Sequence, residues 1–134
     1  MLLDTSGLLC FLHQDEPQHK KAVNFLANAN GILLLHNYIL AELVALGLVR
    51  RLSQSIVLSY TLELLNNPKV AMVWVDEPLY QEAVSLLMSR SDKTYSLCDA
   101  VNFVLMRKLG IMEALTTDKH FEQEGFTRLL QPDA

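Results

Sequence analysis

The stretch MLLDTSGLL, residues 1–9, places an acidic side chain directly after a short apolar run. Asp4 is the only charged side chain between Met1 and Gln14. The apolar run is typical of a buried strand, and TSGLLCFL after it indicates a turn into a helix that Thr5 or Ser6 could cap. Asp4 is therefore predicted at the end of a strand, either as a local structural group or as part of a functional site.

The same alternation of strand and helix continues along the whole chain. Apolar runs that indicate strands lie at 1–4, 32–36, 70–76, 112–118 and 127–131. Helical spacing of apolar residues, with stop signals such as Asn30-Gly31 and Gly110, indicates helices at 5–12, 17–29, 37–52, 53–66, 78–88, 97–109 and 118–124. This order predicts one α/β domain over residues 1–134, an α/β/α sandwich around a mostly parallel sheet of four to five short strands. Such sheets bind ligands beyond the carboxyl ends of their strands.

Composition narrows the classes of function. The chain of 134 residues is 51% hydrophobic with a net charge of -4, which argues against a DNA-binding surface that acts by general electrostatic attraction. No apolar stretch is long enough to span a membrane, and the first residues lack the basic start and cleavage site of a signal peptide. Cys10 and Cys98 lie in apolar surroundings and are expected to be buried free thiols. We therefore expect a cytoplasmic protein with no membrane contact.

Three more carboxylates repeat the pattern of Asp4. Glu42 is the only charged residue between Lys21 and Arg50, and Asp99 is the only one between Lys93 and Arg107. Asp118 follows Ala-Leu-Thr-Thr at the end of a predicted strand. A doubly wound sheet brings strand ends and the first turns of helices to one crevice, so these acids are expected to meet there.

Each acid also has a structural interpretation. Asp99 stands three residues after Ser96, the spacing of a capping box, and Asp118 could cap the helix that follows it. Asp4 could accept backbone N–H groups of the next turn. Glu42 fits no such role, because it lies one turn into an apolar helix, where burial of an unpartnered carboxylate is costly.

Crowded carboxylates repel one another unless a cation lies among them, and hard divalent ions prefer oxygen ligands. The acids together therefore predict a site for Mg²⁺ or Mn²⁺. Zinc is less favoured, because the histidines show no ligand spacing with the cysteines and each is expected at the surface or at a helix end. They are His13, His19, His36 and His120.

With the acids placed, the chain resembles the PIN-domain family over nearly its full length. The motifs that carry the resemblance are LLDTS at 2–6, ILAEL at 39–43, SLCDA at 96–100 and the pattern T-x-D-x-x-F-x-x-x-G from Thr116 to Gly125. The resemblance implies that Asp4, Glu42, Asp99 and Asp118 form the acidic quartet of a metal centre, as ligands and catalytic groups. It also implies that hydroxyl groups orient ligands or water, namely those of Thr5, Ser6, Ser96 and Thr116.

The sequence departs from the family pattern at two of these positions. Ser6 stands where many relatives carry Asn, which keeps a hydrogen-bonding side chain but shortens its reach. His120 stands where some relatives carry a further acid, which argues against a full second metal site.

The resemblance implies a divalent-metal-dependent endoribonuclease, the toxin of a VapBC-type toxin-antitoxin pair, which hydrolyses phosphodiester bonds of RNA. Its partners would be an RNA substrate, a cognate antitoxin and a second copy in a homodimer. The acidic site would need the ion to bind RNA, with help from Lys93 or Lys119. Two alternatives stay open: a PIN-domain nuclease of RNA maturation without an antitoxin, and a non-catalytic module whose apolar helices, especially 38–48, bind a partner helix.

Overall fold

A computed structural model describes residues 1–132, so residues 133–134 of the predicted domain lie outside the described residues. Within the described range, the strands form one sheet in the order β3-β2-β1-β4-β5, and every pair of neighbours is parallel. Leu2 of β1 is in register with Leu34 on one side and Ala114 on the other. The strands are β1 (Leu2–Leu3), β2 (Leu33–His36), β3 (Val70–Val73), β4 (Glu113–Leu115) and β5 (Thr127–Arg128).

The helices begin and end close to the predicted positions, and α6 has exactly the predicted bounds. The capping box of Ser96 and Asp99 begins α6, and Gly110 ends it in the left-handed conformation with φ 66°. The helices are α1 (Thr5–Leu12), α2 (His19–Ala27), α3 (Asn37–Val49), α4 (Gln54–Asn66), α5 (Glu77–Ser89), α6 (Leu97–Leu109) and α7 (His120–Gln123).

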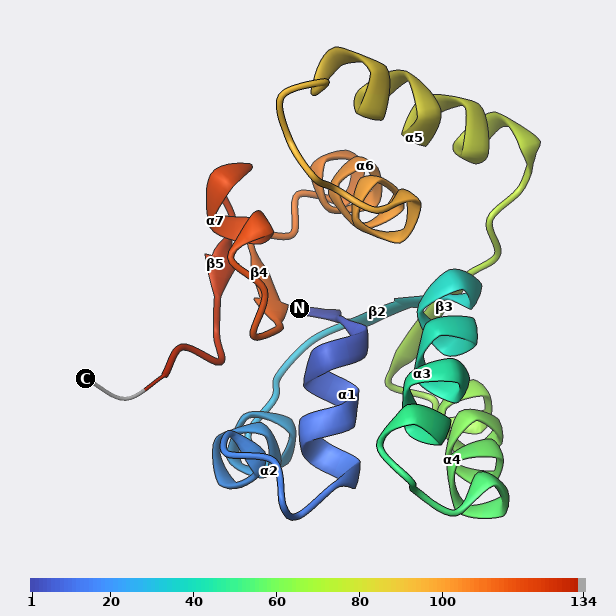
Figure 1. The fold of residues 1–134 in the computed structure, drawn as a ribbon, viewed down its shortest axis with the longest axis vertical. Helices are drawn as coiled ribbons and strands as arrows, with labels where there is room; N and C mark the ends of the chain where they lie inside the picture. Colours follow the sequence, from blue (N-terminus) through green and yellow to red (C-terminus); the bar gives the residue numbers. More distant parts are fainter. Residues whose placement is uncertain (133–134) are drawn as a thin grey trace.

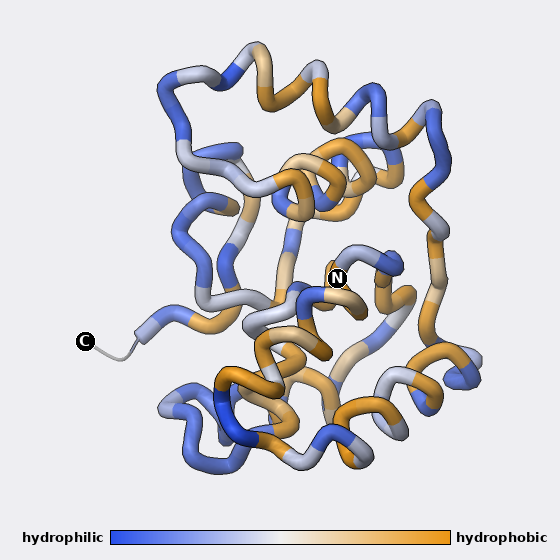
Figure 2. Tube along the Cα trace, turned by 45° about the vertical axis from the view of Figure 1, so that its right-hand side comes forward, coloured by the Kyte–Doolittle hydropathy of each residue, from blue (hydrophilic) through white to orange (hydrophobic). Residues whose placement is uncertain are grey.

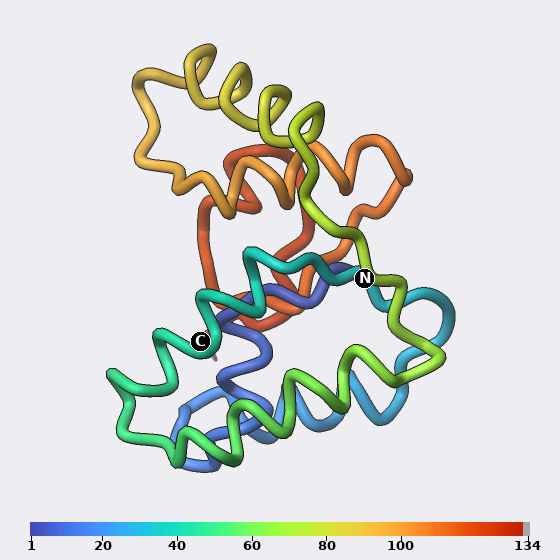
Figure 3. The backbone as a smooth tube through the Cα atoms, turned by 90° about the vertical axis from the view of Figure 1, so that its right-hand side faces the viewer, coloured from blue at the N-terminus to red at the C-terminus, as the bar shows by residue number. Residues whose placement is uncertain are grey.

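The direction of the connections decides which helices cover which face of the sheet. The chain moves outward from β1 to β2 and β3, then returns to β4 on the far side of β1. Because parallel crossovers are right-handed, the return requires helices on the opposite face. Figures 1 and 3 show this arrangement, with α1 to α4 on one side of the sheet and α5 and α6 on the other. The predicted α/β/α sandwich with a parallel sheet is confirmed.

The core fills the space between the sheet and its helices. Leu2, Leu34 and Leu35 of the central strands are completely inaccessible to solvent, as are Phe103 of α6 and Phe121 of α7. Figure 2 shows hydrophobic residues along the central strands and hydrophilic residues mainly on the outer turns. Burial on both faces explains why these strands are continuous apolar runs without alternation.

Strand β3 ends earlier than its apolar pattern predicts, at Val73 instead of residue 76. The backbone N–H of Val75 donates to Oδ1 of Asn37, 2.7 Å away, and so no longer pairs with a neighbouring strand. Asp76 then caps α5 by accepting from the backbone N–H of Leu79. A side chain from α3 therefore ends the strand, which local sequence could not reveal.

Gly7 allows the first turn of α1 to lie against the end of β4. A Cβ atom at this position would lie 2.0 Å from the carbonyl oxygen of Leu115, so only glycine fits. This close approach brings the segment after β1 next to the segment after β4. From β1 the chain adds β2 and β3 on one side, and it then adds β4 and β5 on the other side. Parallel sheets of this kind form a ligand crevice at this switch point between β1 and β4.

Candidate metal centre

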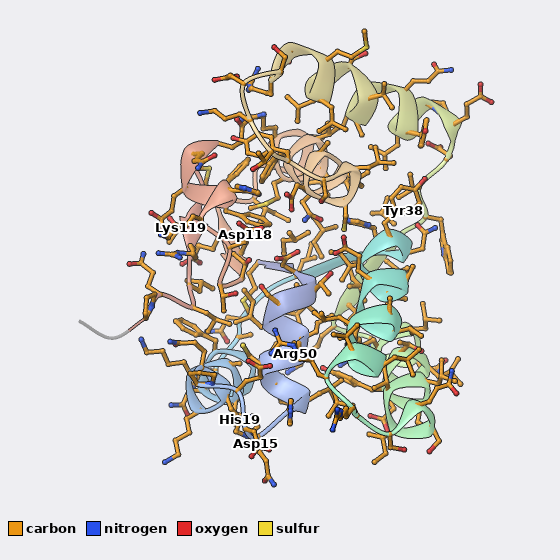
Figure 4. All side chains as sticks on the ribbon, in the orientation of Figure 1. Asp15, His19, Tyr38, Arg50, Asp118 and Lys119 are labelled. Carbon is orange, nitrogen blue, oxygen red and sulfur yellow. The ribbon has the colours of Figure 1, made fainter. Side chains whose placement is uncertain are left out.

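A hollow of about 640 Å³ lies at this crevice, and all four predicted carboxylates line it. Asp4 follows β1, Asp118 follows β4, Asp99 lies in the first turn of α6 and Glu42 lies in α3. The labelled Asp118 and Lys119 in Figure 4 mark the turn between β4 and α7. The structure therefore brings together acids that are up to 114 residues apart in the sequence, since Asp4 and Asp118 share the hollow.

Hydroxyl groups surround the acids where the resemblance implies them. The Oγ1 of the buried Thr116 donates to Oδ2 of Asp4 at 2.7 Å and accepts from the backbone N–H of Asp118 at 3.0 Å. Ser6 Oγ lies 3.3 Å from the same Asp4 oxygen and accepts from the backbone N–H of Thr117 at 3.0 Å. These contacts fix the Asp4 carboxylate and tie the segment after β1 to the segment after β4.

Two of the acids also have the structural roles that the sequence suggested. The Asp99 side chain accepts from the backbone N–H of Ser96 at 3.1 Å, and Ser96 Oγ accepts from the backbone N–H of Asp99 at 3.0 Å. Asp118 Oδ1 accepts from the backbone N–H of His120 at 2.9 Å at the start of α7. These bonds position the two carboxylates, and they leave the other oxygen of Asp118 directed at His120, 3.5 Å from its Nδ1.

Glu42 differs from the sequence argument in one respect. The sequence predicts a desolvated carboxylate within an apolar helix, but the Glu42 side chain is exposed. Successive residues of a helix point in different directions, so apolar neighbours in sequence do not bury a side chain that faces a hollow. Glu42 lines the hollow beside the exposed Val49 of the same helix, and its Oε1 accepts from Thr5 Oγ1 at 2.7 Å.

Burial and crowding alter the acidity of Asp4, which is only 5% exposed. Burial raises the pKa of this carboxyl to about 7; the hydrogen bond from Thr116 acts in the opposite direction, and the charges of Asp99 and Glu42 raise the pKa further. A cation in the hollow would relieve this repulsion. The donor set therefore fits a divalent ion that takes oxygen ligands.

All four histidines lie at helix ends, as predicted, but His120 has a contact that its position alone did not reveal. One ligand atom each from Asp99, Asp118 and His120 lie within 4.8 Å of one another. His120 Nδ1 is 3.0 Å from Asp99 Oδ2. The group of candidate metal ligands among the described residues thus includes a histidine, which can offer a nitrogen.

Asn102 is a buried polar residue of the site that the sequence reasoning missed. Its Nδ2 donates to Asp4 Oδ1 at 3.3 Å, and its Oδ1 lies 2.5 Å from Nε2 of His36. Because an amide oxygen only accepts, His36 must carry its proton on Nε2. Burial lowers the pKa of His36 to about 4, against a weaker opposite effect of this hydrogen bond, so the ring is neutral. The available signal was a polar residue three positions after Asp99, on the same helix face.

Both cysteines are buried and free, as predicted. Cys98 lies beside the site, where burial and then the charges of Glu42 and Asp4 raise the pKa of its thiol far above the usual value. It is therefore a neutral thiol. Lys93 and Lys119, proposed above as aids to RNA binding, are exposed, and none of the described residues that line the hollow is a lysine.

A five-stranded parallel sheet with acids gathered beyond its carboxyl edge defines the class of this protein. The chain belongs to the PIN domain family, whose model matches residues 1–126. The curated relatives include the 23S rRNA-specific endonuclease VapC20 of Mycobacterium tuberculosis, from strains H37Rv and CDC 1551, each 26% identical over 129 residues. The alignments cover 96% of this chain and 97% of each relative.

Structural comparison leads to the same relative. The crystal structure of Mycobacterium tuberculosis VapC20, described as a sarcin-ricin loop cleaving toxin, superposes with a TM-score of 0.85 and 25% sequence identity. The match covers 94% of this chain and 95% of that one. Among the described residues, no helix is both long enough and apolar enough to cross a membrane.

Proposed function

We propose that this protein is a divalent-metal-dependent endoribonuclease and the toxin of a toxin-antitoxin pair. The observation that carries the proposal is the meeting of Asp4, Glu42, Asp99 and Asp118 in one hollow at the carboxyl edge of the sheet. The similarity to VapC20 over nearly the full length of both chains supports RNA as the substrate. Mg²⁺ or Mn²⁺ is the proposed ion.

The residues of the hollow have separable roles in this proposal. Asp99 and Asp118 would hold the ion, which when bound supplies a water of lowered pKa and stabilises charge on the phosphate. Thr116 and Asn102 hold both oxygens of Asp4 in one orientation. Glu42 is exposed and held by Thr5, so it is the carboxylate best placed to orient the attacking water or to accept its proton.

The acidic hollow repels phosphate groups, so productive RNA binding should depend on the ion. The test is cleavage of a synthetic RNA hairpin with the sarcin-ricin loop sequence in Mg²⁺, Mn²⁺ or EDTA, beside a hairpin with a scrambled loop. Asp4→Asn, purified identically, is the control for contaminating nucleases. Metal-dependent cleavage that Asp4→Asn lacks would support the proposal, whereas cleavage in EDTA or equal cleavage by Asp4→Asn would refute it.

We also propose a protein partner and a homodimer, on the basis of apolar side chains exposed on α3 and α4. Val49 is 73% exposed, Ile56 62% and Leu62 60%, and exposed apolar side chains that gather together can mark an interaction surface. Light scattering of the purified protein tests the dimer. Co-purification of the chain with a small protein from the source cells tests the antitoxin, and a monomer that purifies alone would contradict both.

A further inference from the structure

His120 presents a ring nitrogen to the two carboxylates that begin α6 and precede α7. Its Nδ1 lies 3.0 Å from Oδ2 of Asp99 and 3.5 Å from Oδ2 of Asp118. Two ligand atoms bound about 2.1 Å from one ion at a right angle lie about 3.0 Å apart. The two distances from His120 Nδ1 therefore suit coordination of one ion as well as the shorter of them suits a hydrogen bond, and the ligand atoms of all three residues lie within 4.8 Å of one another.

Several contacts hold the His120 ring in this orientation. Its Nε2 lies 3.2 Å from Oγ1 of Thr94, and its backbone N–H donates to Asp118. The ring also makes a T-shaped contact with Tyr95, with centroids 5.1 Å apart at an interplanar angle of 62°. The ring is only partly exposed, and the Thr94 hydroxyl offers Nε2–H an acceptor.

The Thr94 hydroxyl can either donate to Nε2 or accept from it, so it is compatible with the tautomer that leaves Nδ1 free to bind a cation. A neutral ring with its proton on Nε2 directs the lone pair of Nδ1 at two carboxylate oxygens, which is repulsive unless a cation lies between them. A metal-ligating histidine commonly donates its other N–H to a nearby acceptor, which fixes the tautomer and the ring plane. Thr94 occupies that outer position here.

We propose that His120 Nδ1 is a direct ligand of the divalent ion, together with Asp99 and Asp118. The resulting nitrogen and oxygen ligands select a first-row transition ion such as Mn²⁺ over Mg²⁺, because imidazole binds transition ions well and Mg²⁺ prefers oxygen. This inference rests on the metal dependence in the proposed function and adds a ligand and an ion preference. The competing role for His120 is that of a hydrogen-bond donor to Asp99.

The deciding experiment is electron spin echo envelope modulation of Mn²⁺ bound to the full-length protein, without RNA. A directly coordinated nitrogen gives a ¹⁴N modulation, which we expect in the wild type, not in His120→Asn, and unchanged in His13→Asn. His13 lies at the far end of α1 from Asp4 and serves as the matched control. A wild-type spectrum without directly coordinated nitrogen would overturn the inference, even where His120→Asn fails to fold.

Calorimetric titration with Mn²⁺ and Mg²⁺ gives a second readout. His120→Asn should weaken Mn²⁺ binding by about tenfold or more and Mg²⁺ binding much less. His120→Asp supplies a third carboxylate, so it should shift the preference toward Mg²⁺. Equal weakening of both ions in His120→Asn would contradict the ion preference.

The outcomes also separate this inference from the proposed nuclease. Failure of the wild type to bind either ion would overturn both. Nitrogen coordination in a protein that cleaves no RNA would support the His120 ligand and count only against the nuclease. Cleavage of RNA with Mn²⁺ bound by oxygen atoms alone would leave the nuclease intact and overturn the role of His120.

Discussion

Asp4 should make the metal-free protein less stable as the pH rises. In the folded chain its pKa is about 7, and its ordinary value is 3.8. The native state therefore binds a proton more tightly than the unfolded state, and the stability that this proton supplies is lost as the pH rises through 7. Asp4→Asn removes the ionisable group but keeps its size and one acceptor oxygen, so the variant should lack this loss.

The magnitude follows from the two pKa values. A shift from 3.8 to about 7 corresponds to roughly 4 kcal/mol across the full titration. Between pH 5 and pH 8 the loss amounts to roughly 2.5 kcal/mol. His36 acts in the opposite direction, because its pKa of about 4 lies below the ordinary 6.5 and the folded state gains stability as the pH rises through that interval.

The comparison with Asp4→Asn isolates Asp4, because the contribution of His36 is present in both proteins and cancels. Glu124 does not interfere: burial would raise its pKa, but hydrogen bonds from Arg107, Arg90 and Tyr95 lower it to about 2, well below this pH interval.

The assay is urea unfolding of wild type and Asp4→Asn in EDTA at pH 5, 6, 7 and 8. We expect the free energy of unfolding of Asp4→Asn, relative to wild type, to increase by roughly 2.5 kcal/mol from pH 5 to pH 8. A difference between the two proteins that does not change with pH would show that Asp4 is ionised throughout. It would thereby refute the argument that burial and crowding hold its proton.

Three further substitutions test the site and its support. Glu42→Gln keeps an acceptor for the Thr5 hydroxyl but loses the charge, so the variant should fold normally and lose most RNA cleavage. Near-normal cleavage with an unchanged circular dichroism spectrum would show that Glu42 is not part of the site. In EDTA, Asp99→Asn should be as stable as wild type, or more stable by on the order of 1 kcal/mol. Millimolar Mg²⁺ should raise its melting temperature much less than that of the wild type, and an equal rise in both proteins would contradict the role of Asp99 as a ligand. Gly7→Ala should lower the free energy of unfolding by on the order of 3 kcal/mol or more, because the new methyl group overlaps the Leu115 carbonyl. A near-native midpoint of urea unfolding would show that α1 can move away from β4.

Apolar runs, helical spacing and stop signals were sufficient to predict the order of strands and helices. The strand predicted at 32–36 is a continuous apolar run, and the helix at 97–109 has apolar residues at helical spacing and ends at Gly110, so both are visible in the local sequence. The end of β3 was less predictable, because the Asn37 side chain that takes the N–H of Val75 comes from α3. Local pattern carries no information on such contacts.

The sequence by itself determined that acids would stand at the carboxyl ends of parallel strands, because an isolated charge in an apolar run is visible without coordinates. Only the tertiary structure decided how those acids are surrounded. Burial of Asp4 beside Asn102, exposure of Glu42 at the hollow and the approach of His120 Nδ1 to Asp99 all depend on side chains from different elements. These contacts join residues far apart in the chain, and their distances follow from how helices pack on the sheet. Spacing in one sequence cannot encode that packing.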